Sequence, residues 1–453
     1  MRRAAAFLLL AGALMLAVGW LADRPGEVSI TWQGWRVDTS FGMLLAGAAA
    51  LAALAVALAS LWRLVVTGPR RFQRWRRDRR RRRGYAALTS GLVAVAAGDP
   101  QDARRHARRA DALLDEPPLT MLLAAQAAQL VGDEEEARRH FERMLGKPET
   151  EFLGLRGLIS QALKSGDEAG ALSLARRART LRPKTAWVQT TLLGLEARAG
   201  DWEAAQCTLR DARRIGAVPP AQAARHAAAI ALERSREAAG AGRAAEALAQ
   251  AEAAWKADPD HEAVAAWLAG LHLDAGRARA AQRIIEQAWS RAPRPELAAL
   301  HPRARGATDP IARVKAAERL AALAPRHPQS HLALARAAID AQLWGEARRH
   351  LDAAGAVSAG QADGAVARLM ARVEEAEKGD GVAARRWLAR AAEAPGEDGW
   401  TCGACGARHA RWQATCGHCG AFDRIAWSAG PRVDAPAAAR AALASRASEG
   451  KGP

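Results

Sequence analysis

Four cysteines near the C-terminus carry the clearest chemistry in this sequence. Cys402 and Cys405 form one Cys-x-x-Cys pair, Cys416 and Cys419 form a second, and ten residues separate the pairs. Each Cys-x-x-Cys-Gly turn aims two thiolates at one point, and four thiolates make a closed tetrahedral site for a soft metal ion. We therefore predict a structural metal site in this segment, with zinc as the first choice and iron as the alternative.

We call residues 398–428 the knuckle. Gly406 and Gly420, which follow the cysteine pairs, are expected to relieve steric strain in the turns, and backbone amides to hydrogen-bond the sulfurs. A disulfide is the remaining alternative, and the inferred reducing compartment disfavours it. The fifth cysteine, Cys207, is predicted to be an ordinary small buried residue of a helix. Four aromatic side chains should pack around the knuckle or dock it on the last repeat: Trp400, Trp412, Phe422 and Trp427.

A repeat of 34 residues organises the chain before the knuckle. Alanine, leucine and arginine dominate the sequence and favour helix over sheet. An alanine stands five positions past each repeat glycine, and Pro183, Pro259 and Pro293 stand seventeen past three of them. Glycine permits the tight turn of a helical hairpin, alanine lets its two helices approach closely, and proline stops the second helix. The repeat glycines are Gly98, Gly132, Gly166 and Gly200, followed by Gly242 and Gly276.

This pattern resembles the tetratricopeptide repeat. Weaker units place Gln342 and Gly379 where the glycine belongs, so about eight hairpins are expected within 84–395. Hairpins of this kind stack into a superhelix whose groove binds proteins or peptides. The resemblance implies that the first helix of each hairpin lines the groove. A solvated helix face is the alternative for each candidate, as is packing between repeats for Trp187. By register, the candidate partner-binding residues are Gln126, Arg156, Lys164, Trp187, Thr190, Arg198 and Asp274.

Two apolar runs precede the repeats. Residues 4–22 have about the length that a helix needs to cross roughly 30 Å of hydrocarbon, and residues 41–66 carry no charge until Arg63. A cleaved signal peptide is the alternative for the first run, but a second apolar run follows closely. We therefore expect a two-helix transmembrane hairpin within 1–68, with 23–40 as the external loop.

An arginine cluster follows the second apolar run, in the segment 69–83. Its ten arginines and one aspartate supply half of the formal net charge of +18. Cations that flank a span stay on the cytoplasmic side, so both termini are expected in the cytoplasm. The cluster is also expected to attract anionic lipid headgroups, and binding of nucleic acid is not expected. Its members are Arg70, Arg71, Arg74, Arg76, Arg77, Arg79, Arg80, Arg81, Arg82 and Arg83.

Two apolar runs, the loop GEVSITWQGWRVDTS, a basic segment and repeats together resemble the HemY family of bacterial tetratricopeptide membrane proteins. The resemblance covers nearly the whole chain. It implies a protein of the inner membrane that is associated with haem, and so porphyrin, metabolism. The knuckle is similar to the rubredoxin-like module of lipopolysaccharide assembly protein B, another membrane-tethered repeat protein, which has a single span.

The sequence favours an adaptor over an enzyme, because its eleven histidines show no spacing typical of a metal site or a catalytic triad. We expect an all-α, membrane-anchored cytoplasmic scaffold, connected with haem biosynthesis through the resemblance. The alternatives are an envelope adaptor that regulates lipopolysaccharide assembly and a haem-binding carrier or sensor, although no sequence feature supports haem binding. Residues 429–453, rich in alanine and arginine without an apolar period, are expected to form a disordered tail.

Overall fold

The computed structural model describes residues 20, 26–114, 117–358, 363–394 and 398–429. The first expected span, 4–22, therefore lies outside the described residues apart from Trp20, and the expected tail lies outside them apart from Ala429. The chain divides into two compact units, residues 1–123 and 124–453.

The first unit begins with a β-hairpin. Strands β1 (Glu27–Trp32) and β2 (Trp35–Ser40) pair antiparallel, with Trp32 opposite Trp35. Gln33 and Gly34 form the turn, and both have the positive φ that a tight two-residue hairpin turn requires. The segment expected as a loop thus contains ordered strands, because its β-branched residues alternate on either side of this turn.

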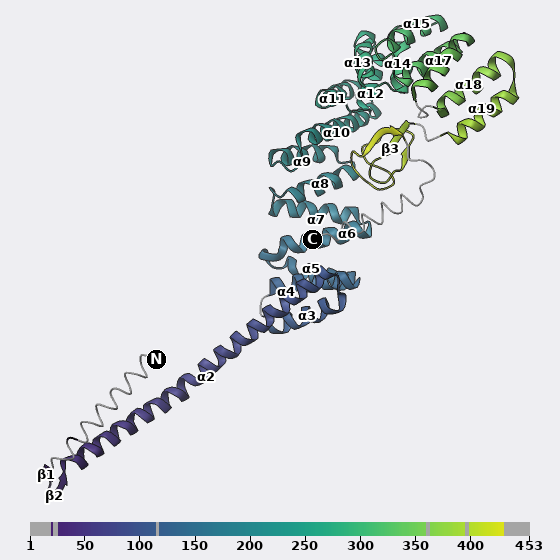
Figure 1. Cartoon of the computed structure of the whole chain (residues 1–453). Coiled ribbons are helices and arrows are strands. Elements are labelled where there is room, and N and C mark those ends of the chain that lie inside the picture. The colour runs from purple at the N-terminus through teal and green to yellow at the C-terminus, as the bar shows by residue number, and fades with distance from the viewer. Residues whose placement is uncertain (1–19, 21–25, 115–116, 359–362, 395–397, 430–453) are drawn as a thin grey trace. The chain divides into compact units, whose positions relative to one another are not determined.

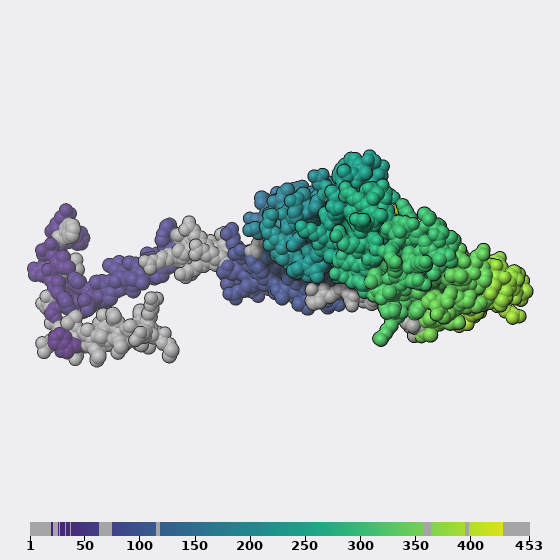
Figure 2. All heavy atoms as spheres, turned by 90° about the horizontal axis from the view of Figure 1, so that it is seen from above, coloured from purple at the N-terminus to yellow at the C-terminus, as the bar shows by residue number. Residues whose placement is uncertain are grey.

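Helix α2 (Phe41–Ala97) continues from the second apolar run through the arginine cluster into the first repeat. Among the described residues, Phe41–Trp62 is the one candidate membrane span, and none of it is buried. This stretch is the narrow purple part of the molecule in Figure 2. The arginines within 76–83 are exposed, whereas the side chains of Arg70, Arg71 and Arg74 lie outside the described residues.

Helices then alternate in consecutive pairs joined by short turns (Figure 1). The described residues contain nine such pairs, from α2 with α3 to α18 with α19, rather than about eight. The additional pair is α14 with α15, whose turn glycine, Gly306, falls 30 residues after Gly276 and so off the register. The helices after α2 are α3 (Pro100–Leu113), α4 (Pro117–Val131), α5 (Glu134–Leu145), α6 (Pro148–Ser165), α7 (Glu168–Leu181), α8 (Ala186–Arg198), α9 (Trp202–Arg214), α10 (Pro220–Gly240), α11 (Ala244–Ala257), α12 (Val264–Asp274), α13 (Ala278–Arg291), α14 (Pro295–Ala304), α15 (Pro310–Ala321), α16 (Pro328–Asp340), α17 (Trp344–Ser358), α18 (Asp363–Lys378) and α19 (Gly381–Glu393).

The predicted roles of the repeat residues are confirmed. All six repeat glycines have φ between 72° and 85°, and Gln342 takes the same left-handed conformation at 60°. The alanine five positions past the turn residue is buried in each unit that keeps the register, from Ala103 to Ala384, whereas the exposed Ile311 takes this position in the off-register hairpin. Where aspartate follows the glycine, its carboxylate accepts N–H groups of the next helix, as Asp167 does from Gly170. Glycine therefore ends one helix and aspartate begins the next.

We call the face presented by the first helices of the hairpins after α5 the inner surface, and its last four helices contact one another in turn. Helix α12 contacts α14, α14 contacts α16, and α16 contacts α18. The knuckle follows α19 and folds as a three-stranded antiparallel sheet in the order β4-β3-β5. Its strands are β3 (Asp398–Cys402), β4 (Arg408–His409) and β5 (Ile425–Ala429).

Candidate metal centre and its docking site on the repeats

The four predicted metal ligands converge at one point in the knuckle. Their sulfur atoms all lie within 4.8 Å of one another. The Sγ atoms of Cys402 and Cys419 are 3.8 Å apart, and those of Cys405 and Cys416 are 3.7 Å apart. Thiolates about 2.3 Å from a zinc ion lie roughly 3.8 Å apart in a tetrahedron, so the four side chains fit such an ion.

Two similar turns position these sulfurs. In each turn the carbonyl oxygen of the first cysteine, Cys402 or Cys416, accepts the N–H of the glycine four residues on, at 2.8 Å. Those glycines, Gly406 and Gly420, have φ values of 74° and 66°. The backbone N–H of Ala404 also lies 3.4 Å from the Cys402 sulfur. The predicted roles of the glycines and of an amide hydrogen bond to sulfur are therefore confirmed.

The sulfurs differ in their electrostatic surroundings. Burial raises the pKa of Cys405 to about 12. Burial also acts to raise the pKa of Cys416, but the backbone amides of Cys419 and His418, together with His409, outweigh it and lower this pKa to about 6. The His409 imidazole lies 3.3 Å from that sulfur. At neutral pH a metal ion must therefore displace protons from the more basic thiols, so acid weakens its binding.

The knuckle shares one hydrophobic core with the central repeats. Trp400, Trp412 and Ile425 are buried together with Leu193 of α8 and Ile230 of α10. Figure 1 shows the yellow knuckle beside these helices. The predicted packing of the aromatic residues around the knuckle is confirmed. The alternative of docking on the last repeat is wrong, because the side chains that complement the knuckle lie on α8, α10 and α12.

Cations of the repeats stack on the knuckle's indole rings. The Arg236 guanidinium of α10 lies 5.2 Å from the Trp412 ring centroid and 5.6 Å from that of Trp267 on α12. Arg294, just before α14, lies 5.8 Å from the Trp400 ring centroid. These contacts place cations over desolvated aromatic faces, where the attraction is strongest.

Asp423 of the knuckle anchors the interface from a fully buried position. His226 Nδ1 of α10 lies 2.7 Å from Oδ2, while Arg225 Nε and His261 Nε2 lie 3.4 Å and 3.7 Å from Oδ1. Burial acts to raise the pKa of Asp423, but the hydrogen bond with His226 and the nearby His261 and Arg225 outweigh it and lower this pKa to about 2. The carboxylate therefore stays charged inside the interface at neutral pH.

Three further hydrogen bonds join repeat side chains to the knuckle backbone. Arg198 donates to the Gly420 oxygen at 2.8 Å, Arg236 donates to the Trp412 oxygen at 3.2 Å, and Glu233 accepts from the Ala414 nitrogen at 3.1 Å. These partners are between 176 and 222 residues apart in the sequence. Sequence reasoning missed Asp423, His226, Glu233 and Arg236 because no local pattern marks such distant pairs.

All of the candidate partner-binding residues lie on first helices, but their surroundings differ. Arg156 of α6 lies 5.6 Å from the Trp187 ring centroid on α8, and Phe152 meets the same ring edge-on at 6.4 Å. This cluster joins two neighbouring first helices. The exposed Thr190 donates its hydroxyl to carbonyl oxygens of its own helix, those of Ala186 and Trp187.

The other candidates do not gather into one site. Gln126 is half-buried on α4. Lys164 lies 3.6 Å from a carboxylate oxygen of Glu134 on α5, and Asp274 lies 3.3 Å from the Arg303 guanidinium of α14. Arg198 donates a hydrogen bond to the knuckle. A residue that was predicted to bind a partner protein therefore binds the C-terminal module of its own chain.

Cys207 departs from its prediction. It lies on the exposed face of α9, where the Arg210 guanidinium is 3.0 Å from its sulfur. The prediction of a buried residue is wrong because Ala205, Thr208 and Leu209 take the inward positions of this helix.

Stacked helical hairpins that carry a docked four-cysteine module define a tetratricopeptide-repeat scaffold. Residues 238–303 match the tetratricopeptide repeat family, and residues 26–148 match the family described as the HemY protein N-terminus. The probable magnetosome protein Mms48 of Magnetospirillum gryphiswaldense is 31% identical over 424 residues, which cover 92% of this chain and 91% of that protein. The chain belongs to the HemY family of tetratricopeptide-repeat proteins.

Solved structures share only the general helical-repeat architecture. The C-terminal part of a TPR repeat-containing protein from Cytophaga hutchinsonii is 13% identical, covers 52% of this chain and 93% of that chain, and has a TM-score of 0.30. A crystal structure of MamA is 15% identical, covers 35% of this chain and 92% of that chain, and has a TM-score of 0.24. Scores this low carry no argument about function.

Proposed function

We propose that this protein is a membrane-anchored adaptor that gathers partner proteins on the inner surface of its repeats and is not an enzyme. The observation that carries the proposal is the face formed by the first helices α12, α14, α16 and α18, on which a cleft of about 590 Å³ stays open. A solenoid presents such a face as an extended docking surface. The exposed Arg156 beside the half-buried Trp187 offers a second contact region.

The exposed apolar helix supports the membrane anchor. Phe41–Trp62 has no buried residue, and lipid is the environment in which so long an apolar helix is stable. The arginines after it favour a cytoplasmic location for the repeats and contact with anionic headgroups. We further propose that 4–22 supplies the first of two spans, that both termini lie in the cytoplasm, and that the β-hairpin within 23–40 lies outside.

The metal centre has a structural role in this proposal. Zinc is the ion that four converging thiolates favour in a reducing cytoplasm, with iron as the alternative. The bound ion would stabilise a knuckle too small for a core of its own, and the knuckle in turn covers part of the inner surface.

Family membership suggests the pathway. The HemY family name connects the adaptor with haem biosynthesis, whereas the likeness of the knuckle to the lipopolysaccharide assembly module supports an envelope role. The name of the Magnetospirillum relative adds a magnetosome role as a third possibility. Depletion of the protein should therefore be followed by measurement of porphyrin and lipopolysaccharide levels. A Soret shift on titration with haem would instead favour a haem carrier or sensor.

Crosslinking in intact membranes followed by affinity purification tests the adaptor itself. The full chain should capture discrete proteins, and the double variant Arg156→Ala with Trp187→Ala should capture less of them. The matched control is Arg210→Ala on α9, away from the first helices. Equal capture by all three chains, or no specific partner at all, would overturn the proposal.

A further inference from the structure

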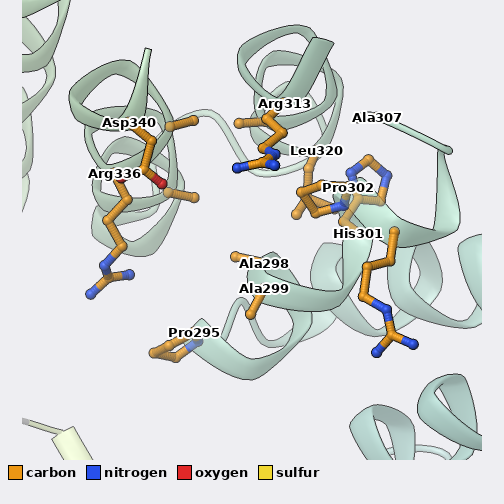
Figure 3. Close-up of a pocket in the computed structure, with 14 residues that line it drawn as sticks. Pro295, Ala298, Ala299, His301, Pro302, Ala307, Arg313, Leu320, Arg336 and Asp340 are labelled. Atoms are coloured by element: carbon orange, nitrogen blue, oxygen red, sulfur yellow. The ribbon is translucent and has the colours of Figure 1, made fainter. Parts of the chain in front are cut away.

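An open cleft of about 590 Å³ lies where α14, α15 and α16 meet (Figure 3). It belongs to the inner surface, because α14 and α16 are both first helices. Small side chains leave this space unfilled, since six of the fourteen residues that line it are alanines. Besides two prolines, the apolar lining consists of Ala298, Ala299, Ala307, Ala317, Ala333, Ala337 and Leu320.

Charged side chains around the cleft are mostly positive. Each of its three helices contributes one arginine, which are Arg303, Arg313 and Arg336, and Asp340 is the one carboxylate that lines it. Figure 3 shows Arg313 reaching toward the space opposite Arg336 and Asp340. Asp340 is also 3.4 Å from the guanidinium of Arg372, a residue outside the cleft. Arg303 is likewise paired with Asp274 of α12, so Arg313 and Arg336 are the cations on which the charge of the cleft depends.

A buried histidine adds an unpartnered polar atom to the wall. His301 is fully buried and lines the cleft, and its Nδ1 atom has no hydrogen-bond partner. Because this atom is buried, it is part of the wall and not a group on which the docking of a ligand depends.

We propose that this cleft receives an acidic segment of a partner protein, whose carboxylates face Arg313 and Arg336 and whose small apolar side chains rest on the alanine lining. This inference rests on the proposed adaptor function and names the chemistry of its partner. The chain's own C-terminal tail does not fit the charge, because residues 430–453 contain three arginines and one lysine against one aspartate and one glutamate. The arginine cluster of a second copy of this chain does not fit either, because its positive charge would be repelled by the arginines of the cleft.

Peptide binding to the full chain in detergent tests the inference. The probe is a fluorescein-labelled peptide of alternating glutamate and alanine, and the reference is the same peptide with glutamine in place of glutamate; binding is followed by fluorescence anisotropy. Arg313→Gln and Arg336→Gln should each weaken binding of the acidic peptide about threefold, and together about tenfold. Asp340→Asn should strengthen it, because the repelling carboxylate is removed.

The matched control is Lys315→Gln, which removes the same charge from an exposed position of α15 that does not line the cleft. Equal weakening by this variant would show that only the net charge matters and would overturn the inference. Preference for the glutamine peptide would overturn the acidic chemistry while leaving peptide docking intact. Tighter binding of a single-stranded oligonucleotide, lost in the same arginine variants, would reassign the cleft to nucleic acid.

Discussion

At the scale of single residues, the buried Asp423 carboxylate is the charged group around which the polar contacts of the docked knuckle gather. A buried carboxylate is costly unless cations and hydrogen bonds compensate for its lost hydration. His226, His261 and Arg225, which all come from the repeats, provide that compensation here. Removal of the charge therefore weakens the contacts of all three groups inside the interface, although Arg225 keeps its ion pair with Glu262 and His226 keeps its contact with Gln222.

Asp423→Asn should lower the stability of the docked knuckle by about 3 kcal/mol. Urea unfolding followed by tryptophan fluorescence would measure this, because Trp400 and Trp412 become exposed on release. Asp260→Asn is the control, since Asp260 forms an exposed ion pair with Arg291 that should contribute less than about 1 kcal/mol. Equal effects of the two variants would contradict the anchoring role.

Cys402→Ser should abolish metal binding, whereas Cys207→Ser should leave about one ion per chain. The reason is that Cys402 is one of four converging thiols while Cys207 lies on the exposed face of α9. Elemental analysis of the purified proteins gives the count. Because we propose that a bound ion stabilises the knuckle, the Cys402 variant should also become sensitive to protease within 398–428. A knuckle that stays protected without metal would refute this dependence.

His301 should make stability depend on pH. Burial lowers its pKa below the ordinary value of 6.5, against an opposing effect of Glu286. The unfolded chain therefore binds a proton first as pH falls, so the contribution to stability is complete above pH 6.5 and declines below it. Unfolding free energies measured from about pH 7.5 to about pH 5.5 should fall more steeply in the wild type than in His301→Gln. Parallel slopes would argue against the prediction.

At the scale of elements, the turn between the two helices of each hairpin determines where one helix ends and the next begins. A left-handed residue ends the first helix, and a buried alanine five positions later lets the second helix pack closely. Gln342 meets the same backbone requirement without the conformational freedom of glycine, and its φ of 60° therefore strains α16 and α17 at their junction.

Gln342→Gly should stabilise the protein by about 1 kcal/mol, because glycine adopts a positive φ without a steric penalty. Gln342→Ala keeps the β-carbon and should change stability little. Thermal unfolding of the two variants beside the wild type makes the comparison. A destabilising glycine would mean that the glutamine side chain contributes more than its backbone costs.

At the scale of the whole molecule, the knuckle is part of the repeat core and not a separate appendage. Its apolar residues, the stacked arginines and the Asp423 network all meet first helices of the central hairpins. The chain thus covers part of its own docking surface and leaves the cleft between α14 and α16 open. The proposed partner site and the candidate metal centre therefore both belong to the repeat body and the module docked on it.

Labelling of cysteines in intact cells can test the expected topology. Ser29→Cys in the β-hairpin should react with a membrane-impermeant maleimide from outside, because 23–40 is expected to be external. Cys207 is exposed on the repeats and should react only after lysis. Labelling of Cys207 in intact cells would place the repeats on the opposite side from the one that we propose.

Local patterns were sufficient for much of this molecule. The spacing of Cys402 to Cys419, the 34-residue register and the apolar run from Phe41 are each set by residues close in sequence, and a turn or a helix obeys the same short-range rules in any fold. Such patterns predicted the all-α repeats, the metal cysteines and the exposed apolar helix. The hairpin at Gly306 was not predicted, because this glycine lies 30 residues after Gly276 and not 34.

Only the tertiary structure decided where the knuckle docks and which part of the inner surface stays open. It also showed that the knuckle is hydrogen-bonded to Arg198, one of the predicted partner-binding residues. Asp423 and His226 are 197 residues apart, and neither carries a local signal of the other. The outward position of Cys207 and the cleft beside Arg313 likewise depend on neighbouring helices. Contacts of this kind follow from complementary shape and charge between distant surfaces, which no periodicity along a single chain encodes.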